Sequence, residues 1–110
     1  MVPTNAIQIA AEFRDRLERE IGERVRKVRV FGSYARGTAR PDSDLDVLVL
    51  VDYRDRHTRR QISDIAYEVS ARHDFRPDIS PVVLGETQFA NLAALERRIA
   101  LDILDEGVDV

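Results

Sequence analysis

The segment Leu45–Val51 constrains the fold of this chain most, because it is almost continuously apolar and rich in β-branched valine. Such a run is typical of a central strand that is covered on both faces. The preceding segment Val25–Phe31 instead alternates between apolar and charged residues, as a half-buried strand does. Between them, Gly32–Ser43 contains two glycines and a proline, which predicts a loop with one short helical turn. The sequence therefore predicts a strand, a loop and a buried strand in succession.

Two long segments have the apolar spacing of amphipathic helices. The first begins at Thr4, which we expect to be the N-cap, and stops at Gly22. The second spans Tyr53–His73 and has a strongly charged start. We expect its Arg59-Arg60 pair to be a solvated helix face and its histidines to be surface residues without a catalytic partner: His57 and His73.

The C-terminal third predicts one more strand and one more helix. Pro77–Leu84 suits a strand, and Pro81 within it indicates an edge strand or a bulge because proline cannot donate a ladder hydrogen bond. Apolar residues at helical spacing then predict a single helix over Glu86–Asp105. A short apolar end, Val108–Val110, follows Gly107. These elements complete the pattern of an α/β (α+β) domain.

Composition limits the classes of function open to the chain. Its 110 residues, 44% of them hydrophobic, suit one compact domain without a separate substrate-binding lobe. The net charge of −3 provides no global positive field, which disfavours generic nucleic-acid binding. The absence of cysteine excludes disulfides and thiolate metal sites, and no apolar run is long enough to cross a membrane. We therefore expect a cytoplasmic protein that does not bind membranes.

The residues that could take part in chemistry lie around the predicted loop. Gly32 and Ser33 open it, and Asp44 and Asp46 close it where the buried strand begins. Side chains alternate along a strand, so the two carboxylates share a face and repel one another unless a cation lies between them. Mg²⁺ is typically held by one or two carboxylates together with substrate phosphates. Glycine allows a phosphate to approach the backbone, and the serine hydroxyl and nearby N–H groups can donate to its oxygens.

Two arginines of the same loop are candidates for binding phosphate. Arg36 and Arg40 lie between the glycine and the carboxylates, where a guanidinium could neutralise phosphate charge. The alternative for each is an ordinary solvated loop arginine. The candidate nucleotide-binding residues are therefore Gly32, Ser33, Arg36 and Arg40.

The stretch VFGSYARGTARPDSDLDVLVLV resembles the signature of the polymerase-β-like nucleotidyltransferases, and of their minimal MNT branch in particular. The resemblance extends through the helix and strand order over nearly all of residues 1–110, which implies a single minimal nucleotidyltransferase domain. It implies a small mixed sheet with helices mainly on one face. It also implies catalysis with two divalent ions, Mg²⁺ or alternatively Mn²⁺, and a nucleoside triphosphate, ATP by preference, as substrate.

The same resemblance implies a third carboxylate on a later strand, for which Asp78 is the matching candidate. Asp44, Asp46 and Asp78 would then be both the catalytic residues and the metal ligands. The alternative for Asp78 is a turn acid after Pro77, in which case the protein would bind a nucleotide without turning it over.

Minimal proteins of this family are commonly paired with a small helical HEPN toxin, which the MNT member neutralises, in some cases by adenylylating a tyrosine. The resemblance thus implies an antitoxin that transfers AMP to a HEPN ribonuclease. Two alternatives remain open, a small-molecule enzyme of the aminoglycoside nucleotidyltransferase type and a non-catalytic partner that blocks its toxin by contact. A homo-oligomer could cover the apolar strand surface when the partner is absent.

Overall fold

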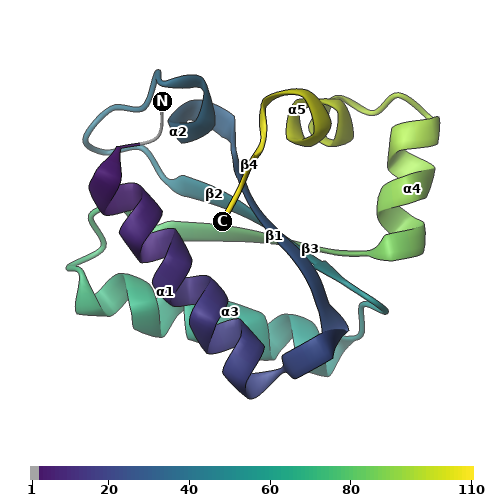
Figure 1. The fold of residues 1–110 in the computed structure, drawn as a ribbon, viewed down its shortest axis with the longest axis horizontal. Helices are drawn as coiled ribbons and strands as arrows, with labels where there is room; N and C mark the ends of the chain where they lie inside the picture. The colour runs from purple at the N-terminus through teal and green to yellow at the C-terminus, as the bar shows by residue number, and fades with distance from the viewer. Residues whose placement is uncertain (1–2) are drawn as a thin grey trace.

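The computed structural model describes residues 3–110, which form a four-stranded mixed sheet in the order β3-β2-β1-β4. The strands are β1 (Val25–Phe31), β2 (Leu45–Val51), β3 (Ile79–Gly85) and β4 (Val108–Asp109). β1 pairs antiparallel with both β2 and β4, whereas β2 pairs parallel with β3. Figure 1 shows β2 inside the sheet and β3 and β4 at its edges. The prediction of a central buried strand is confirmed.

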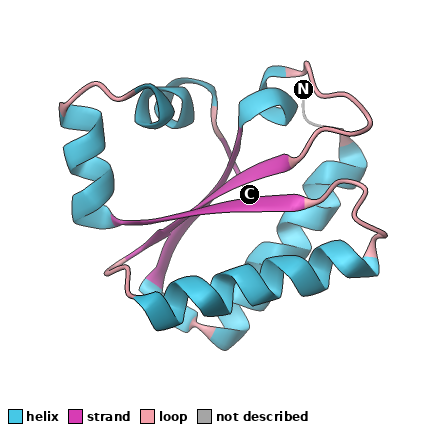
Figure 2. Cartoon of the chain, turned by 180° about the vertical axis from the view of Figure 1, so that it is seen from behind, coloured by secondary structure: helices cyan, strands magenta, loops and turns pink. Residues whose placement is uncertain are grey.

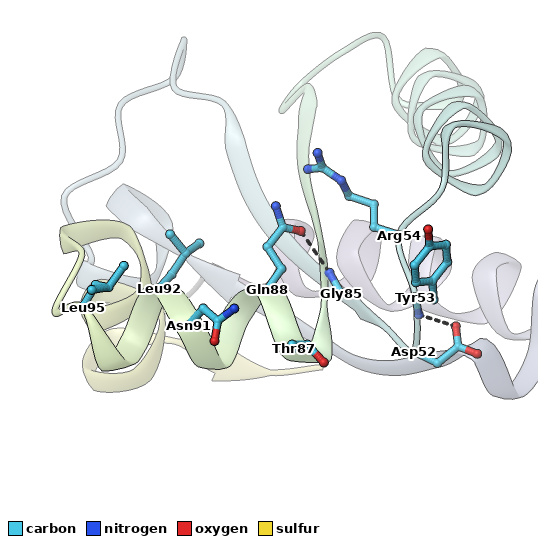
Figure 3. Close-up of a pocket in the computed structure, with 9 residues that line it drawn as sticks. All are labelled: Asp52, Tyr53, Arg54, Gly85, Thr87, Gln88, Asn91, Leu92 and Leu95. Carbon is cyan, nitrogen blue, oxygen red and sulfur yellow. Dashed lines mark hydrogen bonds between the residues drawn. The ribbon is translucent and has the colours of Figure 1, made fainter.

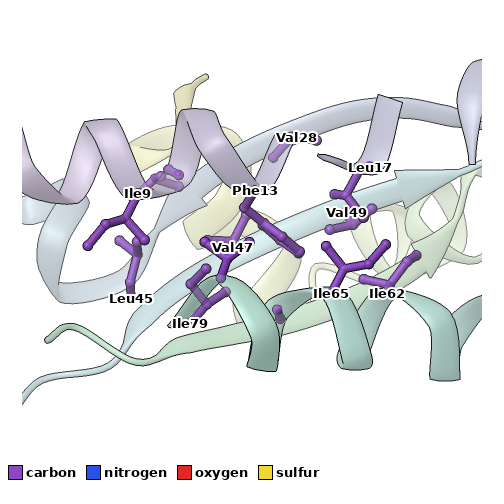
Figure 4. Packing of buried hydrophobic residues seen from close by; sticks show 14 of the residues in the cluster. Ile9, Phe13, Leu17, Val28, Leu45, Val47, Val49, Ile62, Ile65 and Ile79 are labelled. Atoms are coloured by element: carbon purple, nitrogen blue, oxygen red, sulfur yellow. The ribbon is translucent and has the colours of Figure 1, made fainter. Parts of the chain in front are cut away.

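Two 17-residue helices, α1 (Thr4–Glu20) and α3 (Arg56–Arg72), pack against each other and cover one face of the sheet (Figures 1 and 4). Their apolar stripes meet alternate residues of β2, which places Phe13, Leu17, Val47, Val49 and Ile65 in the main core. All five are at most 2% exposed. This core fixes the register of β2, because a slip by one residue would turn the side chains that face α1 and α3 to the other face of the sheet.

The other face of the sheet carries a smaller apolar cluster under two nine-residue helices, α4 (Glu86–Ala94) and α5 (Arg98–Glu106). It contains Phe31, Leu48, Leu84 and Ile103, all buried. The fold class expected from the sequence is thus confirmed, with the long helices on one face and a lighter cover on the other. Asp46, at the start of β2, is only partly buried.

The boundaries of three elements differ from the sequence prediction. Thr4 is the first residue of α1 and not its N-cap, because the helix already begins with the carbonyl of Pro3 accepting from Ile7 N at 3.0 Å. α3 begins at Arg56, three residues later than predicted, since the Asp55 side chain accepts from Thr58 N at 2.7 Å and caps it there. β3 begins at Ile79 after a short turn, and its edge position agrees with Pro81.

The predicted single C-terminal helix is wrong, because the chain breaks into α4 and α5. Between them Glu96 has φ 54°, a left-handed backbone that no helix accommodates. The break turns α5 back over the sheet, so that β4 reaches β1 and pairs with Arg29 and Val30. Figure 2 shows this reversal of the chain between α4 and β4 from the other side.

A short 3₁₀ helix, η1 (Gly22–Arg24), links α1 to β1. Within residues 3–110, every helix is too short or too polar to span a bilayer.

Candidate active site

The Gly32-Ser33 loop opens with the five-residue helix α2 (Gly32–Arg36), which leaves the end of β1. Gly32 starts it at φ 73°, and Gly37 ends it in the left-handed conformation at φ 78°. The carbonyl oxygen of Ser33 accepts from Thr38 N at 2.9 Å, which closes the turn. The sequence prediction of a loop with one helical turn is therefore confirmed, and the turn fixes where the serine lies.

Asp44 and Asp46 lie beside this turn at the start of β2. Asp46 is paired with Phe31 of β1 and Ser80 of β3, and it is partly buried, whereas Asp44 is exposed. Burial raises the pKa of the Asp46 carboxyl, and the charge of Asp44 raises it further, while the guanidinium of Arg36 opposes both. The charge of Asp44 therefore acts on Asp46, which agrees with the alternation of side chains along a strand.

Gly32 forms one wall of the space that Asp46 occupies. A Cβ on Gly32 would overlap Oδ2 of Asp46 and lie 3.2 Å from its Cγ. The absence of a side chain at position 32 thus lets the carboxylate lie directly against the loop backbone. The sequence identified the glycine as a place for phosphate to approach, and the structure adds that it also makes room for the acid.

Replacing Gly32 by alanine is expected to lower stability by about 1–2 kcal/mol, because φ 73° is left-handed. It is also expected to reduce nucleotidyl transfer at least about tenfold, because the new methyl group displaces the Asp46 carboxylate. Gly22→Ala is the matched control, since Gly22 has φ 78° but open space around its Cβ position. Thermal unfolding should move similarly in both variants, and a loss of transfer in both would contradict the steric role of Gly32.

Asp78, the predicted third acid, lies at the same end of the sheet as Asp44. Its carbonyl oxygen accepts from Leu45 N at 2.8 Å, and the next residue, Ile79, is the register partner of Leu45. The β3 start is held further by the buried hydroxyl of Ser70, which accepts from Ile79 N at 2.9 Å. The Asp78 residue is exposed. The backbone therefore places residue 78 beside the start of the strand that carries Asp44 and Asp46 (the DxD pair), although the three carboxylates do not gather into one metal-binding group.

The two loop arginines differ in how they are held. Arg36 Nη1 lies 3.1 Å from Oε2 of Glu106 in α5, and its charge reaches Asp46. Arg40 is exposed, and its backbone N–H donates to Ser43 Oγ at 2.8 Å. The ion pair with Glu106 could not be found from the sequence, because the two residues are 70 positions apart without a shared motif. The side chain of Arg36 is therefore held by an ion pair, whereas the side chain of Arg40 is exposed to solvent.

The acids suit a hard divalent cation in donor chemistry and in charge. Asp44 and Asp46 offer only oxygen donors, the ligands that Mg²⁺ prefers, and their mutual repulsion is relieved by a cation between them. Across residues 3–110, no group of three or more His, Cys, Asp or Glu side chains is gathered closely enough to hold an ion by itself. The arrangement thus fits an ion that shares its ligands with substrate phosphates, not a closed protein cage.

The remaining polar candidates lie where the sequence placed them or deeper. His57 is exposed, and His73, the C-cap of α3, pairs with Glu12 of α1 at 2.6 Å. Tyr34 is buried, and the pKa of its phenol is raised by that burial and by the charge of Asp44. Tyr34 is a residue of α2, and its side chain packs in the main core.

Comparison with known proteins is consistent with this geometry. Residues 10–108 match the nucleotidyltransferase domain family. A Methanocaldococcus jannaschii protein that carries the provisional name of protein adenylyltransferase is 34% identical over 82 residues, covering 74% of this chain and 81% of the relative.

Solved structures share the fold. A toxin–antitoxin structure with AMP-PNP has a TM-score of 0.59 at 21% identity, covering 88% of this chain and 68% of that chain. A Shewanella oneidensis complex of a tri-AMPylated HEPN toxin with an MNT antitoxin has a TM-score of 0.51 at 20% identity, covering 96% and 67%. A Sulfolobus solfataricus protein assigned provisionally as a nucleotidyltransferase has a TM-score of 0.52 at 18% identity, covering 97% and 86%.

At these identities the structural likeness establishes the fold alone, whereas the match over residues 10–108 establishes the family. The Gly32-Ser33 turn and the two acids at the start of β2 lie within the matched residues. The chain belongs to the nucleotidyltransferase domain family and is a nucleotidyltransferase.

Proposed function

We propose that residues 1–110 form a single minimal nucleotidyltransferase domain that transfers AMP from ATP to a tyrosine hydroxyl of a helical HEPN partner. The reaction would require Mg²⁺, and its outcome would be neutralisation of that partner in the cytoplasm. The observation that carries the reaction type is the Asp46 carboxylate lying against Gly32 with the charge of Asp44 beside it. Two coupled carboxylates at a phosphate-accessible loop suit metal-assisted phosphoryl chemistry.

In the proposed reaction, the acceptor oxygen attacks the α-phosphorus of ATP in line and pyrophosphate leaves. Gly32 gives the triphosphate access to the backbone, and the Ser33 hydroxyl and the arginines at 36 and 40 donate to its oxygens. Asp44 and Asp46 would hold the divalent ions, with Asp78 completing the set and taking the acceptor proton. The ions would supply neutralisation of the charge that develops on the phosphates.

The relatives support the choice of acceptor. The Methanocaldococcus jannaschii relative bears the name of a protein adenylyltransferase, and the Shewanella oneidensis complex contains a HEPN toxin that is tri-AMPylated. A second structure of a toxin–antitoxin holds AMP-PNP.

Co-expression with the neighbouring open reading frame is expected to yield a complex whose partner gains one or more adenylate masses. Pull-down followed by intact-mass measurement on each chain checks this. Co-expression with the Asp44→Asn/Asp46→Asn variant should give the same complex without the added mass. A neighbour that is unlike HEPN proteins, or that neither binds nor gains mass, would overturn the antitoxin role and leave the family assignment untouched.

A further inference from the structure

Three adjoining hollows lie at the ends of β2 and β3 that are remote from Asp44 and Asp78. The first, of about 500 Å³, lies between the loop after β2 and helix α4 (Figure 3). The second, of about 230 Å³, shares Arg54 with the first. The third, of about 510 Å³, shares Arg56 and Arg59 with the second. The shared lining residues show that the three hollows adjoin one another, and together they are here called the arginine groove.

One end of the arginine groove is apolar. Tyr53 is 70% exposed and Leu95 67% exposed, and Leu92 lies between Leu95 and the start of α4. Exposed large apolar side chains that gather in one hollow are characteristic of interaction sites, whereas single ones are ordinary. The Gln88 and Asn91 side chains add hydrogen-bonding groups to the same wall.

The other end of the groove is cationic. The chain has 16 arginines, and four of them lie in the seven positions 54–60: Arg54, Arg56, Arg59 and Arg60. All four are exposed, and among residues 3–110 none of the four forms an ion pair, although eight other arginines do. On a chain of net charge −3, these arginines form a local cluster of positive charge. Arg59 and Arg60 are exposed on α3, as the sequence predicts for a solvated helix face.

Three acids line the hollows, and two of them are paired with an arginine outside the groove. Arg24 lies 3.1 Å from Asp52 and 3.3 Å from Asp55, and Asp64 is the third. The hydrogen bond from Thr58 N–H lowers the pKa of Asp55, and Arg24 lowers it further. Asp52 and Asp55 therefore stay ionised in their pairs with Arg24 and leave the groove arginines available to a ligand.

The groove is also built on fixed backbone. Arg24 Nη2 donates to the carbonyl of Tyr53 at 2.8 Å, and Arg54 Nη1 donates to the carbonyl of Val83 at 3.2 Å. The Gln88 side chain accepts from Gly85 N at 3.3 Å and fixes the start of α4 (Figure 3). A wall that is already ordered loses little conformational entropy on binding.

We infer that the arginine groove docks an acidic segment of a protein partner, with apolar side chains against Tyr53, Leu92 and Leu95 and carboxylates against the arginines. Tyrosine and arginine are the residues that most often dominate protein interfaces. The apolar wall of the first hollow favours a peptide with apolar side chains over the continuous phosphate backbone of RNA. The inference is independent of the transfer reaction, because the groove lies at the opposite end of the strands from the acids.

A display library of random dodecapeptides, selected on the full chain without nucleotide, tests this inference. The enriched peptides are expected to combine two or more acidic residues with an apolar pair. Synthetic copies should bind Arg56→Ala/Arg59→Ala at least about tenfold more weakly, as expected for the loss of two arginine anchors, and Leu95→Asp similarly. Arg19→Ala/Arg76→Ala, which removes the same charge from exposed positions outside the groove, should bind normally.

Three outcomes would overturn the inference. The selected peptides could lack acidic residues, or they could bind the groove variant and the control variant equally well. Alternatively, a dodecamer of single-stranded oligouridine could bind more tightly than the best peptide at the same salt and depend on Arg56 and Arg59, which would assign the groove to nucleic acid. Circular dichroism on each variant confirms that binding is compared between folded proteins.

Discussion

Replacing Asp44 and Asp46 together with asparagine is expected to abolish Mg²⁺-dependent ATP binding and to reduce AMP transfer at least about 1,000-fold. The reason is that bound ions contribute several kcal/mol of charge stabilisation, and each 1.4 kcal/mol corresponds to about tenfold in rate. Calorimetric titration with ATP and Mg²⁺ measures the first effect, and labelled AMP transfer to the co-purified partner measures the second. ATP affinity that is unchanged by EDTA, or by the double substitution, would contradict a metal site at these acids.

The raised pKa of Asp46 in the parent protein predicts how stable the double variant should be. The folded protein raises the pKa of Asp46 above its ordinary value of 3.8, so the folded state binds the proton more tightly than the unfolded chain. Stability therefore falls as pH rises from that ordinary value through the raised one, and it stays lower above it. Without divalent ions at pH 7, the variant should unfold at the same temperature as the parent protein or higher, so lost activity cannot be attributed to unfolding.

Replacing Asp78 with asparagine is expected to reduce transfer at least about 100-fold while ATP binding persists. A group that takes the acceptor proton and completes the ligand set acts mainly in the transition state, so its loss lowers kcat more than substrate affinity. The backbone around it should be unchanged, since the carbonyl of residue 78 and not its side chain bonds to Leu45 N. Single-turnover transfer and calorimetric titration separate the two effects.

Asp42 provides the matched control for this substitution. It is an exposed acid in the same loop region as the DxD pair, so Asp42→Asn removes the same charge without a predicted ligand. We expect its transfer rate to remain within about twofold of the parent protein, in line with surface substitutions of about 0.5 kcal/mol or less. Equal losses at positions 42 and 78 would point to a general charge effect, and normal turnover in Asp78→Asn would place the third acid elsewhere.

The fold was largely predictable where apolar spacing alone decides the structure. β1, β2 and α1 agree with prediction to within a residue or two, because their alternation or helical stripe faces one core. The break at Glu96 was not predictable, since neither glycine nor proline marks it and tertiary packing of α5 enforces the left-handed backbone. β4 was missed for a related reason, because two residues are too few to show a period and they depend on β1.

The candidate site was predictable in its residues but not in its contacts. The alternation rule was sufficient to place Asp44 and Asp46 on one face, and the effect of Asp44 on Asp46 agrees with it. By contrast, the overlap between a Cβ at Gly32 and the Asp46 carboxylate depends on the antiparallel register of β1 and β2. The Arg36–Glu106 pair depends on where α5 lies after the break. Both are properties of the assembled sheet and leave no local pattern.

The ion pair between Arg36 and Glu106 also orders events during synthesis of the protein. The two residues are 70 positions apart, so at about 5–20 residues per second Glu106 is added roughly 4–14 s after Arg36. The pairing of β4 with β1 comes later still. A nascent chain therefore already contains both acids of the DxD pair while its loop arginine has no partner on α5. The contact that holds Arg36 against α5 can therefore form only after residue 106 has been translated.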